Sequence, residues 1–211
     1  WFGIQGLAAS AHLLALGRPD LIADVMRISL QSVRDPQAWE RWMSRFDAER
    51  ALDGRPNVGT WARPKAEGGG GMHMSYLHNT KEDISISGYL ADKPFIKQSN
   101  TLFTTPGDAM RLALGDLLYQ RYGLNSDIGA FGSIANRVTG YSDTAFGGQF
   151  GQMMFFAPRF MQAQFEMITK SVLDRGIEGQ MARRQIASLV GIGVALTEMA
   201  NHSRGIDTEY D

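Results

Sequence analysis

The stretch TPGDAMRLALGDLLYQRYG, residues 105–123, decides the fold class of this chain. Thr105 is a suitable N-cap, Pro106 suits the first helical position, and Asp108 favours the positive end of a helix. The apolar residues that follow recur at spacings of three and four, which predicts one buried helical face that ends at Gly123. These apolar residues are Met110, Ala113, Leu114, Leu117 and Leu118.

Helical periodicity also dominates the N-terminal quarter of the sequence. One apolar face lies between residues 21 and 30, and a second lies between residues 39 and 46. Asp35 followed by Pro36 predicts the N-cap and the first position of the second helix. We therefore expect an N-terminal helical region over residues 1–52.

Residues 53–100 are rich in glycine and proline, which predicts a loop or linker region. The run Gly68–Gly71 favours a flexible linker, an exposed loop or a close packing contact, and the residues after it are expected to stay irregular. A phosphate loop is excluded, because Met72 and His73 stand where a lysine and a hydroxyl residue are required.

Residues 101–211 are expected to form a C-terminal helical bundle. After the first helix, periodic stretches predict a helix over residues 126–140, one that opens at Pro158, and one over about residues 177–199. The fold class predicted for the whole chain is mainly α: a multi-helix bundle with a Gly-rich irregular insertion.

The composition excludes several classes of protein. Among 211 residues, 44% are hydrophobic and 20% are charged, which is typical of a folded domain. A net charge of -1 argues against a nucleic-acid binder with a strong positive field. The absence of cysteine excludes disulfides, thiolate metal sites and a cysteine nucleophile. Because the chain starts with Trp1, we expect it to be a segment of a longer protein.

The histidines do not predict a metal site. His73 and His78 lie five residues apart in the glycine-rich region, whereas helical metal ligands are four apart and need a third partner. His12 and His202 are isolated. We interpret His73 and His78 as solvated loop residues and predict no metal ion and no cofactor.

Paired carboxylates are the main argument for an enzyme. Asp20 and Asp24 lie at helical spacing and would suit an acid–base pair, as Asp47 and Glu49 would in principle. Such spacings are common in any helix, and catalysis would require burial as well. A cell-wall hydrolase or another enzyme is thus an alternative, and the prediction is that the chain is not an enzyme.

A dense cluster of methionine and phenylalanine surrounds Pro158. Core packing is the ordinary interpretation, and the alternative is an adaptable contact surface for a partner subunit or a membrane. Arginines near helix starts, including Arg183 and Arg184, are expected to bind a carboxylate within the fold rather than a phosphate. The candidate interaction residues are Met153, Met154, Phe155, Phe156, Arg159 and Phe160.

Residues 136–200 carry, in order, an NxxTG motif, a short gap, MMFFAPRF, a polar helix and an apolar helix of small residues. This pattern resembles the helical associated domains of large polyvalent proteins. Residues 84–114 and the segment DPQAWERW fit the same pattern, so the resemblance covers about residues 29–211, and the Gly68–Gly71 region departs from it. Its motif residues are Asn136, Arg137, Thr139, Gly140 and Pro158.

Polyvalent proteins are very long multidomain chains of phages and mobile elements, thought to be packaged and delivered with DNA. The resemblance implies a non-catalytic structural segment, because the enzymatic activities of the family lie in other domains. It also implies a place inside the capsid, and in the host cell after ejection. The implied partners are the rest of its own chain and portal-region or sister virion subunits. The alternative is a membrane-contacting component of a DNA-ejection channel.

Within these motifs, structural roles are expected. Gly140 would serve as a helix C-cap, Pro158 as a helix start, and Arg159 as a bridge to a neighbouring element.

Overall fold

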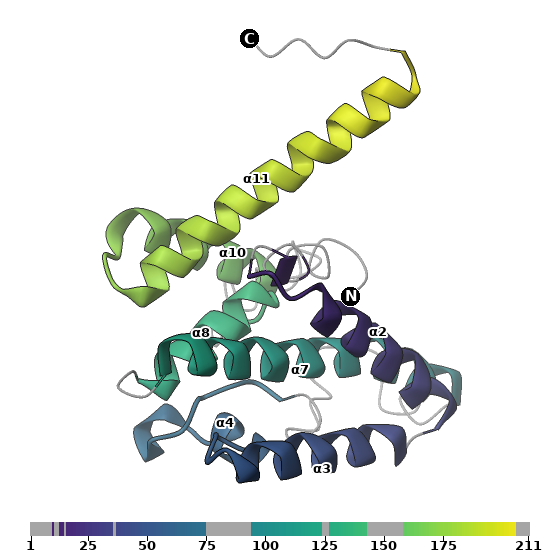
Figure 1. Ribbon diagram of the computed structural model, residues 1–211, viewed down its shortest axis with the longest axis vertical. Helices are drawn as coiled ribbons and strands as arrows, with labels where there is room; N and C mark the ends of the chain where they lie inside the picture. Colours follow the sequence, from purple (N-terminus) through teal and green to yellow (C-terminus); the bar gives the residue numbers. More distant parts are fainter. Residues whose placement is uncertain are drawn as a thin grey trace.

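The computed structural model describes residues 16–35, 37–74, 94–123, 127–142 and 158–205, with Ser10, Leu13 and Leu14; for 94–103 and 158–161 it describes the backbone alone. These parts of the chain are mainly α and pack as a multi-helix bundle, which confirms the predicted fold class (Figure 1). The helices are α2 (Pro19–Arg34), α3 (Gln37–Leu52), α4 (Val58–Ala62), α7 (Pro94–Tyr122), α8 (Ile128–Val138), α10 (Pro158–Leu173) and α11 (Ile177–Ser203), with a 3-10 turn η1 (Lys65–Glu67).

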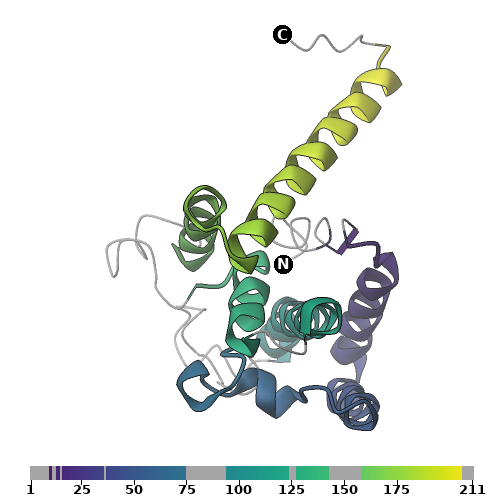
Figure 2. The ribbon, with the colours of Figure 1, turned by 60° about the vertical axis from the view of Figure 1, so that its left-hand side comes forward.

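Helix α7 is the central element, and α2, α4 and α8 pack against it (Figure 2). Every side chain from Thr105 to Leu118 is buried. The predicted apolar face is therefore only part of the buried surface, because Asp108, Arg111 and Asp116 on the same helix are buried too. A helix enclosed on all sides must satisfy its charged groups internally.

The predicted start of this helix at Thr105 is wrong. Helix α7 already begins at Pro94, so residues 94–100, which were expected to be irregular, are helical and Pro106 lies inside the helix. Proline has no N–H, and inside an isolated helix it costs about 3 kcal/mol. Burial of the residues that follow Pro106 offsets this cost, and a local sequence signal cannot register burial.

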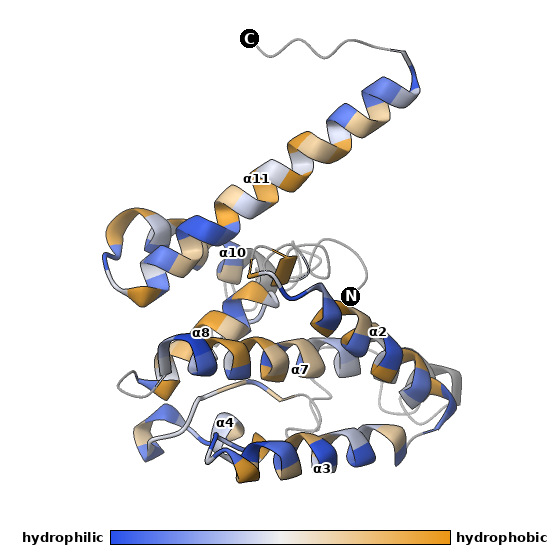
Figure 3. Cartoon of the chain, in the orientation of Figure 1, coloured by the Kyte–Doolittle hydropathy of each residue, from blue (hydrophilic) through white to orange (hydrophobic). Residues whose placement is uncertain are grey.

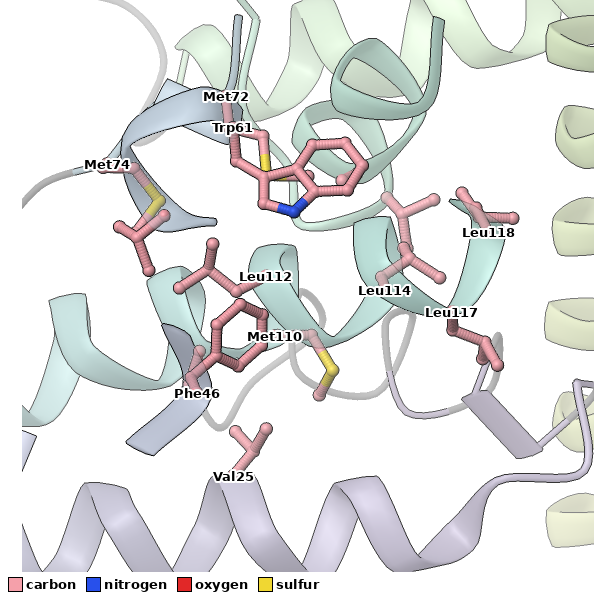
Figure 4. Packing of buried hydrophobic residues seen from close by; sticks show 14 of the residues in the cluster. Val25, Phe46, Trp61, Met72, Met74, Met110, Leu112, Leu114, Leu117 and Leu118 are labelled. Carbon is pink, nitrogen blue, oxygen red and sulfur yellow. The ribbon is translucent and has the colours of Figure 1, made fainter. Parts of the chain in front are cut away.

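The hydrophobic core lies between α7 and the segment that follows α4. Trp61 of α4 and Met72 and Met74 of the following segment pack on α7, while Phe46 of α3 and Val25 of α2 approach from another side (Figure 4). Trp61 and Met74 are fully buried. The residues predicted to be a linker therefore supply some of the largest core side chains.

Within the glycine run, Gly69 and Gly70 are buried and form a packed layer, whereas Gly68 is exposed. The expectation of a flexible or exposed linker is therefore wrong for the middle of the run, and the close-packing alternative is confirmed there. The backbone of the run bonds back to the preceding turn, with Gly70 N donating to Thr60 O at 3.0 Å. A Cβ on Gly132 of α8 would lie 1.7 Å from the carbonyl oxygen of Gly70. The two backbones meet because neither glycine carries a side chain.

Several predicted helix ends are confirmed. The Asp35 carboxylate accepts a hydrogen bond from Gln37 N at the start of α3, at 3.0 Å. Helix α8 begins at Ile128 with Asp127 as its N-cap, whereas its predicted start, Ser126, lies outside the described residues. Gly140 follows the end of α8 with φ 77°, the left-handed conformation of a C-cap glycine, as predicted. Helix α10 begins at Pro158, and α11 begins at Ile177 as predicted.

Helices α10 and α11 form a hairpin over α8, and the C-terminal half of α11 extends away from the other helices (Figures 1 and 2). Apolar residues continue along this extension (Figure 3). Helix α11 thus keeps apolar residues where it leaves the bundle.

Candidate functional site

Six residues meet where α7 passes the C-terminal end of α8, and we call them the Arg111 cluster. Arg111 Nη1 donates to the Asp108 carboxylate at 2.8 Å and to the His73 carbonyl at 2.9 Å. Its Nε donates to the hydroxyl of Thr139 at 2.8 Å. The cluster consists of His73, Asp108, Arg111, Asn136, Thr139 and Tyr141.

Asn136 joins the glycine-rich segment to α8 within this cluster. Its Oδ1 accepts a hydrogen bond from His73 N at 2.9 Å, and its Nδ2 donates to Gly71 O at 2.9 Å. His73 is 8% exposed, and its imidazole stacks on the Tyr141 ring, with 3.8 Å between ring centroids. The prediction of a solvated His73 is therefore wrong, because the packed glycine run carries it into the interior. His78 lies outside the described residues.

The cluster gives a physical role to part of the resemblance motif. Asn136 and Thr139 lie in it, and Gly140 turns the chain so that Tyr141 reaches His73. The charged pair Asp108–Arg111 was missed from the sequence, although its i,i+3 spacing on a helix was a visible signal. A buried carboxylate and guanidinium need each other, since either group alone would be strongly destabilising. These groups hold α7, α8 and residues 71–73 together.

Arg137, the remaining motif residue of α8, points into a second network. Its Nη1 lies 2.7 Å from Glu178 Oε2 of α11, and its Nε lies 3.2 Å from Glu166 Oε2 of α10. Lys170 Nζ also contacts Glu178, at 3.0 Å, and Ser142 Oγ donates to Glu166 at 2.7 Å. One arginine thus connects three helices.

This network lowers the pKa of both glutamates. Burial raises the pKa of Glu178, but the charge and hydrogen bond of Arg137, with those of Lys170, outweigh burial and leave the pKa below its usual range. Burial likewise raises the pKa of Glu166, and hydrogen bonds from Ser142, Gln162 and Arg137 bring it below the usual range.

We expect the Arg137→Met variant to be most destabilised near neutral pH and progressively less so in acid. A carboxylate whose folded pKa is lowered contributes stability above its ordinary pKa, about 4.3 for glutamate, and loses it as the pH falls through the folded value. Urea unfolding between about pH 3 and pH 7 should therefore show the two proteins converging at low pH. A constant gap, matching that of the exposed control Arg63→Met, would contradict this role of Arg137.

A third buried cluster fixes α3 to α7. Asp116 Oδ2 accepts from Arg50 at 2.7 Å, from Arg55 at 2.8 Å and from Gln120 at 2.8 Å. Burial lowers the pKa of Arg50, and the charge of Asp116 opposes that shift. An open depression of about 490 Å³ beside it includes Arg55 and Tyr119 in its lining. Because Arg55 is already bound to Asp116, the cluster mainly joins the two helices.

The other acidic candidates each have a separate partner, and Asp47 is the one among them that is part-buried. Glu49 is exposed and lies 3.5 Å from Arg50 Nη1. Asp20 pairs with Arg18 and Asp24 pairs with Arg27, each at 2.7 Å and each exposed. Asp47 instead accepts a hydrogen bond from Val58 N at 2.8 Å. Each carboxylate has its own partner, and none of these contacts is the buried acid–base geometry that catalysis requires.

One hydroxyl–lysine contact was not predicted. Lys65 Nζ donates to Ser133 Oγ, which in turn donates to Gly129 O in the preceding turn of α8. Lysines that activate a serine are desolvated, whereas Lys65 is exposed. This contact joins the packed glycine segment to α8.

The arginines of α11 do not bind the carboxylates that were predicted for them. Arg183 Nη1 donates to the carbonyls of Ser171 and Asp174 at 2.8 and 3.0 Å, and Arg184 Nη1 donates to the Tyr122 hydroxyl at 2.7 Å. The carbonyls at the end of α10 lack helical partners and carry the negative end of its dipole. They therefore satisfy a guanidinium without a carboxylate.

Most residues of the predicted methionine and phenylalanine contact surface lie outside the part of the chain that the structure describes. Residues 153–156 are not among the described residues, and for Arg159 and Phe160 only the backbone is described. Further along α10, Met167 is buried whereas Phe165 is 58% exposed. In this helix the apolar residues therefore divide between core and surface.

The C-terminal half of α11 carries several exposed apolar side chains. Val190 is 60% exposed, Leu196 52% and Met199 69%. A Cβ placed on Gly191 or Gly193 would meet no atom within 4 Å. Helices that stay apolar on every side are normally covered by other protein or by lipid.

Within the described ranges, no group of three or more histidine, aspartate and glutamate residues is arranged to hold a metal ion. In the same ranges, no helix is both long enough and apolar enough to cross a membrane. Comparison with family models, curated proteins and solved structures found no match to this chain.

Proposed function

We propose that this chain is a non-catalytic structural and interaction segment of a larger, virion-associated phage protein of the polyvalent or ejection type. In this proposal it is packaged in the capsid and delivered with the DNA. Its partners are other parts of its own long chain and portal-region or sister virion subunits. The observation that carries the interaction role is the exposed apolar surface of α11.

The exposed apolar residues of α11 support a role in binding another protein surface. Leu196 and Met199 follow the same helical face as Leu189 and Ile192, at alternating spacings of four and three. Covering an exposed apolar side chain of this size is worth about 1.5–3 kcal/mol. Several such residues on a projecting helix therefore provide a substantial driving force for association.

The buried polar groups favour a scaffold over a catalyst. Asp108 and Asp116 are the most deeply buried carboxylates described, and each is bound to arginine. Glu178 is similarly bound to Arg137. Groups held this way stabilise a rigid platform that carries α11, and they are not available to a substrate.

The virion association rests on the resemblance of the NxxTG and MMFFAPRF blocks. We expect peptide mapping of purified virions from the source of this gene to detect these peptides in a band far heavier than 23.3 kDa. Host membrane and capsid-free lysate serve as controls for contamination. Peptides confined to infected-cell lysate, in a band near the mass of this chain alone, would contradict the virion role.

A further inference from the structure

The projecting part of α11 has a face of heptad spacing that is open to solvent. Ala187, Val190, Val194 and Thr197 follow one another at intervals of three and four residues, and all four are exposed. Gly191 lies beside them with open space around it. We call these five residues the outer face of α11.

The chemistry of the outer face fits a second helix. Alternating spacings of three and four are those that let two helices pack along their length. No charged residue lies between Arg184 and Glu198, so a partner with an equally uncharged stretch is required. Gly191, at the middle of this stretch, permits close approach of the partner backbone.

The charges at the two ends of the stretch select a second copy of this chain in antiparallel orientation. Arg184 lies seven residues before Gly191 and Glu198 lies seven residues after it. With about 3.6 residues per turn, this spacing places both charges on the same side of the helix, about 21 Å apart. An antiparallel copy centred on Gly191 sets each arginine beside the glutamate of the other copy. A parallel copy places no opposite charge at the same level.

We propose that two copies of this chain pair through the outer faces of antiparallel α11 helices. This pairing rests on the proposed interaction role and names its partner. Because each copy offers the same surface, the interface is twofold symmetric and closes at a dimer without further growth. The remaining apolar residues of α11, including Leu196 and Met199, lie on other faces of the helix and stay available to other subunits.

Sedimentation velocity of the whole chain tests this pairing. We expect a mass near 23.3 kDa in dilute solution that rises toward twice that value at about 100 µM, the range of a small interface. Arg184→Glu and Glu198→Arg should each weaken the dimer about tenfold, since each creates two repulsive contacts. The double variant Arg184→Glu/Glu198→Arg should regain most of the original affinity.

Arg63→Glu is the matched control, because Arg63 is exposed, follows α4 far from α11, and undergoes the same change of charge (Figure 1). Circular dichroism on every variant separates weakened pairing from loss of helix, which matters for Arg184 because it also binds Tyr122. A dimer that the control leaves intact and the charge swap restores supports the pairing.

A chain that stays monomeric at every concentration overturns the pairing, as does a double variant no stronger than either single variant. If the chain is monomeric but still copurifies with virions, the proposed dimer is contradicted and the proposed function is not. If the chain is monomeric and binds phosphatidylglycerol vesicles, the partner of the outer face is a membrane and not a second copy, which contradicts the pairing. If the dimer is found only in infected-cell lysate, the pairing is supported and the virion role is contradicted.

Discussion

Gly132→Ala is expected to destabilise the protein by about 3 kcal/mol, the upper range for overpacking a rigid core. The added methyl carbon would lie 1.7 Å from the Gly70 carbonyl oxygen and 2.6 Å from its carbonyl carbon. Both neighbours are backbone atoms in a segment whose hydrogen bonds are already made, so no side chain can rotate away. The packed glycine layer would have to move off α8, which would also stretch the bonds of Asn136 to Gly71 and His73.

Guanidinium unfolding followed by circular dichroism measures this loss. Gly193→Ala is the matched control, because the same methyl group enters open space in another helix. There alanine favours helix by up to about 1 kcal/mol, so the midpoint should stay or rise slightly. A Gly132→Ala protein as stable as the control would mean that Gly70 is not packed against α8.

Asp116→Asn is expected to cost about 3–5 kcal/mol, as when one partner of a buried ion pair is removed. The amide keeps the shape of the carboxylate, so the change isolates its charge. Asp116 is 3% exposed and accepts from both Arg50 and Arg55, which would be left as two buried cations facing each other. We expect the end of α3 and the turn after it to separate from α7.

The same measurement on Asp24→Asn provides the comparison. Asp24 forms an ion pair of similar length with Arg27, but both groups are exposed, and such pairs contribute about 0.5 kcal/mol or less. If Asp116→Asn cost no more than Asp24→Asn, the buried cluster would not be what fastens α3 to α7.

Much of the fold could be predicted from local signals. The apolar spacing in residues 105–123 predicted the central helix, and Asp35, Gly140 and Pro158 marked helix ends where the structure places them. These signals work because a cap or a periodic face depends on residues within one or two turns. The start of α7 was misplaced because Pro106 has the same local appearance at a helix start and inside a buried helix.

The candidate sites were less predictable than the helices. Arg50 and Asp116 are 66 residues apart in sequence, and His73 and Asn136 are 63 apart, so no local pattern connects them. The resemblance motif identified Asn136 and Thr139 but did not indicate their structural role. That role follows only from their position beside Arg111 in the structure.

By itself the sequence determined a mainly helical chain without cysteine, with most helix starts and stops in place, because these depend on composition and on neighbours along the chain. The tertiary structure alone decided which of those residues are buried. It packed Gly69 and Gly70 into the core, placed His73 inside, buried two charged clusters, and left the apolar end of α11 in solvent. Each outcome depends on contacts between segments distant in sequence, whose free energies are set by burial and by the partner that burial supplies.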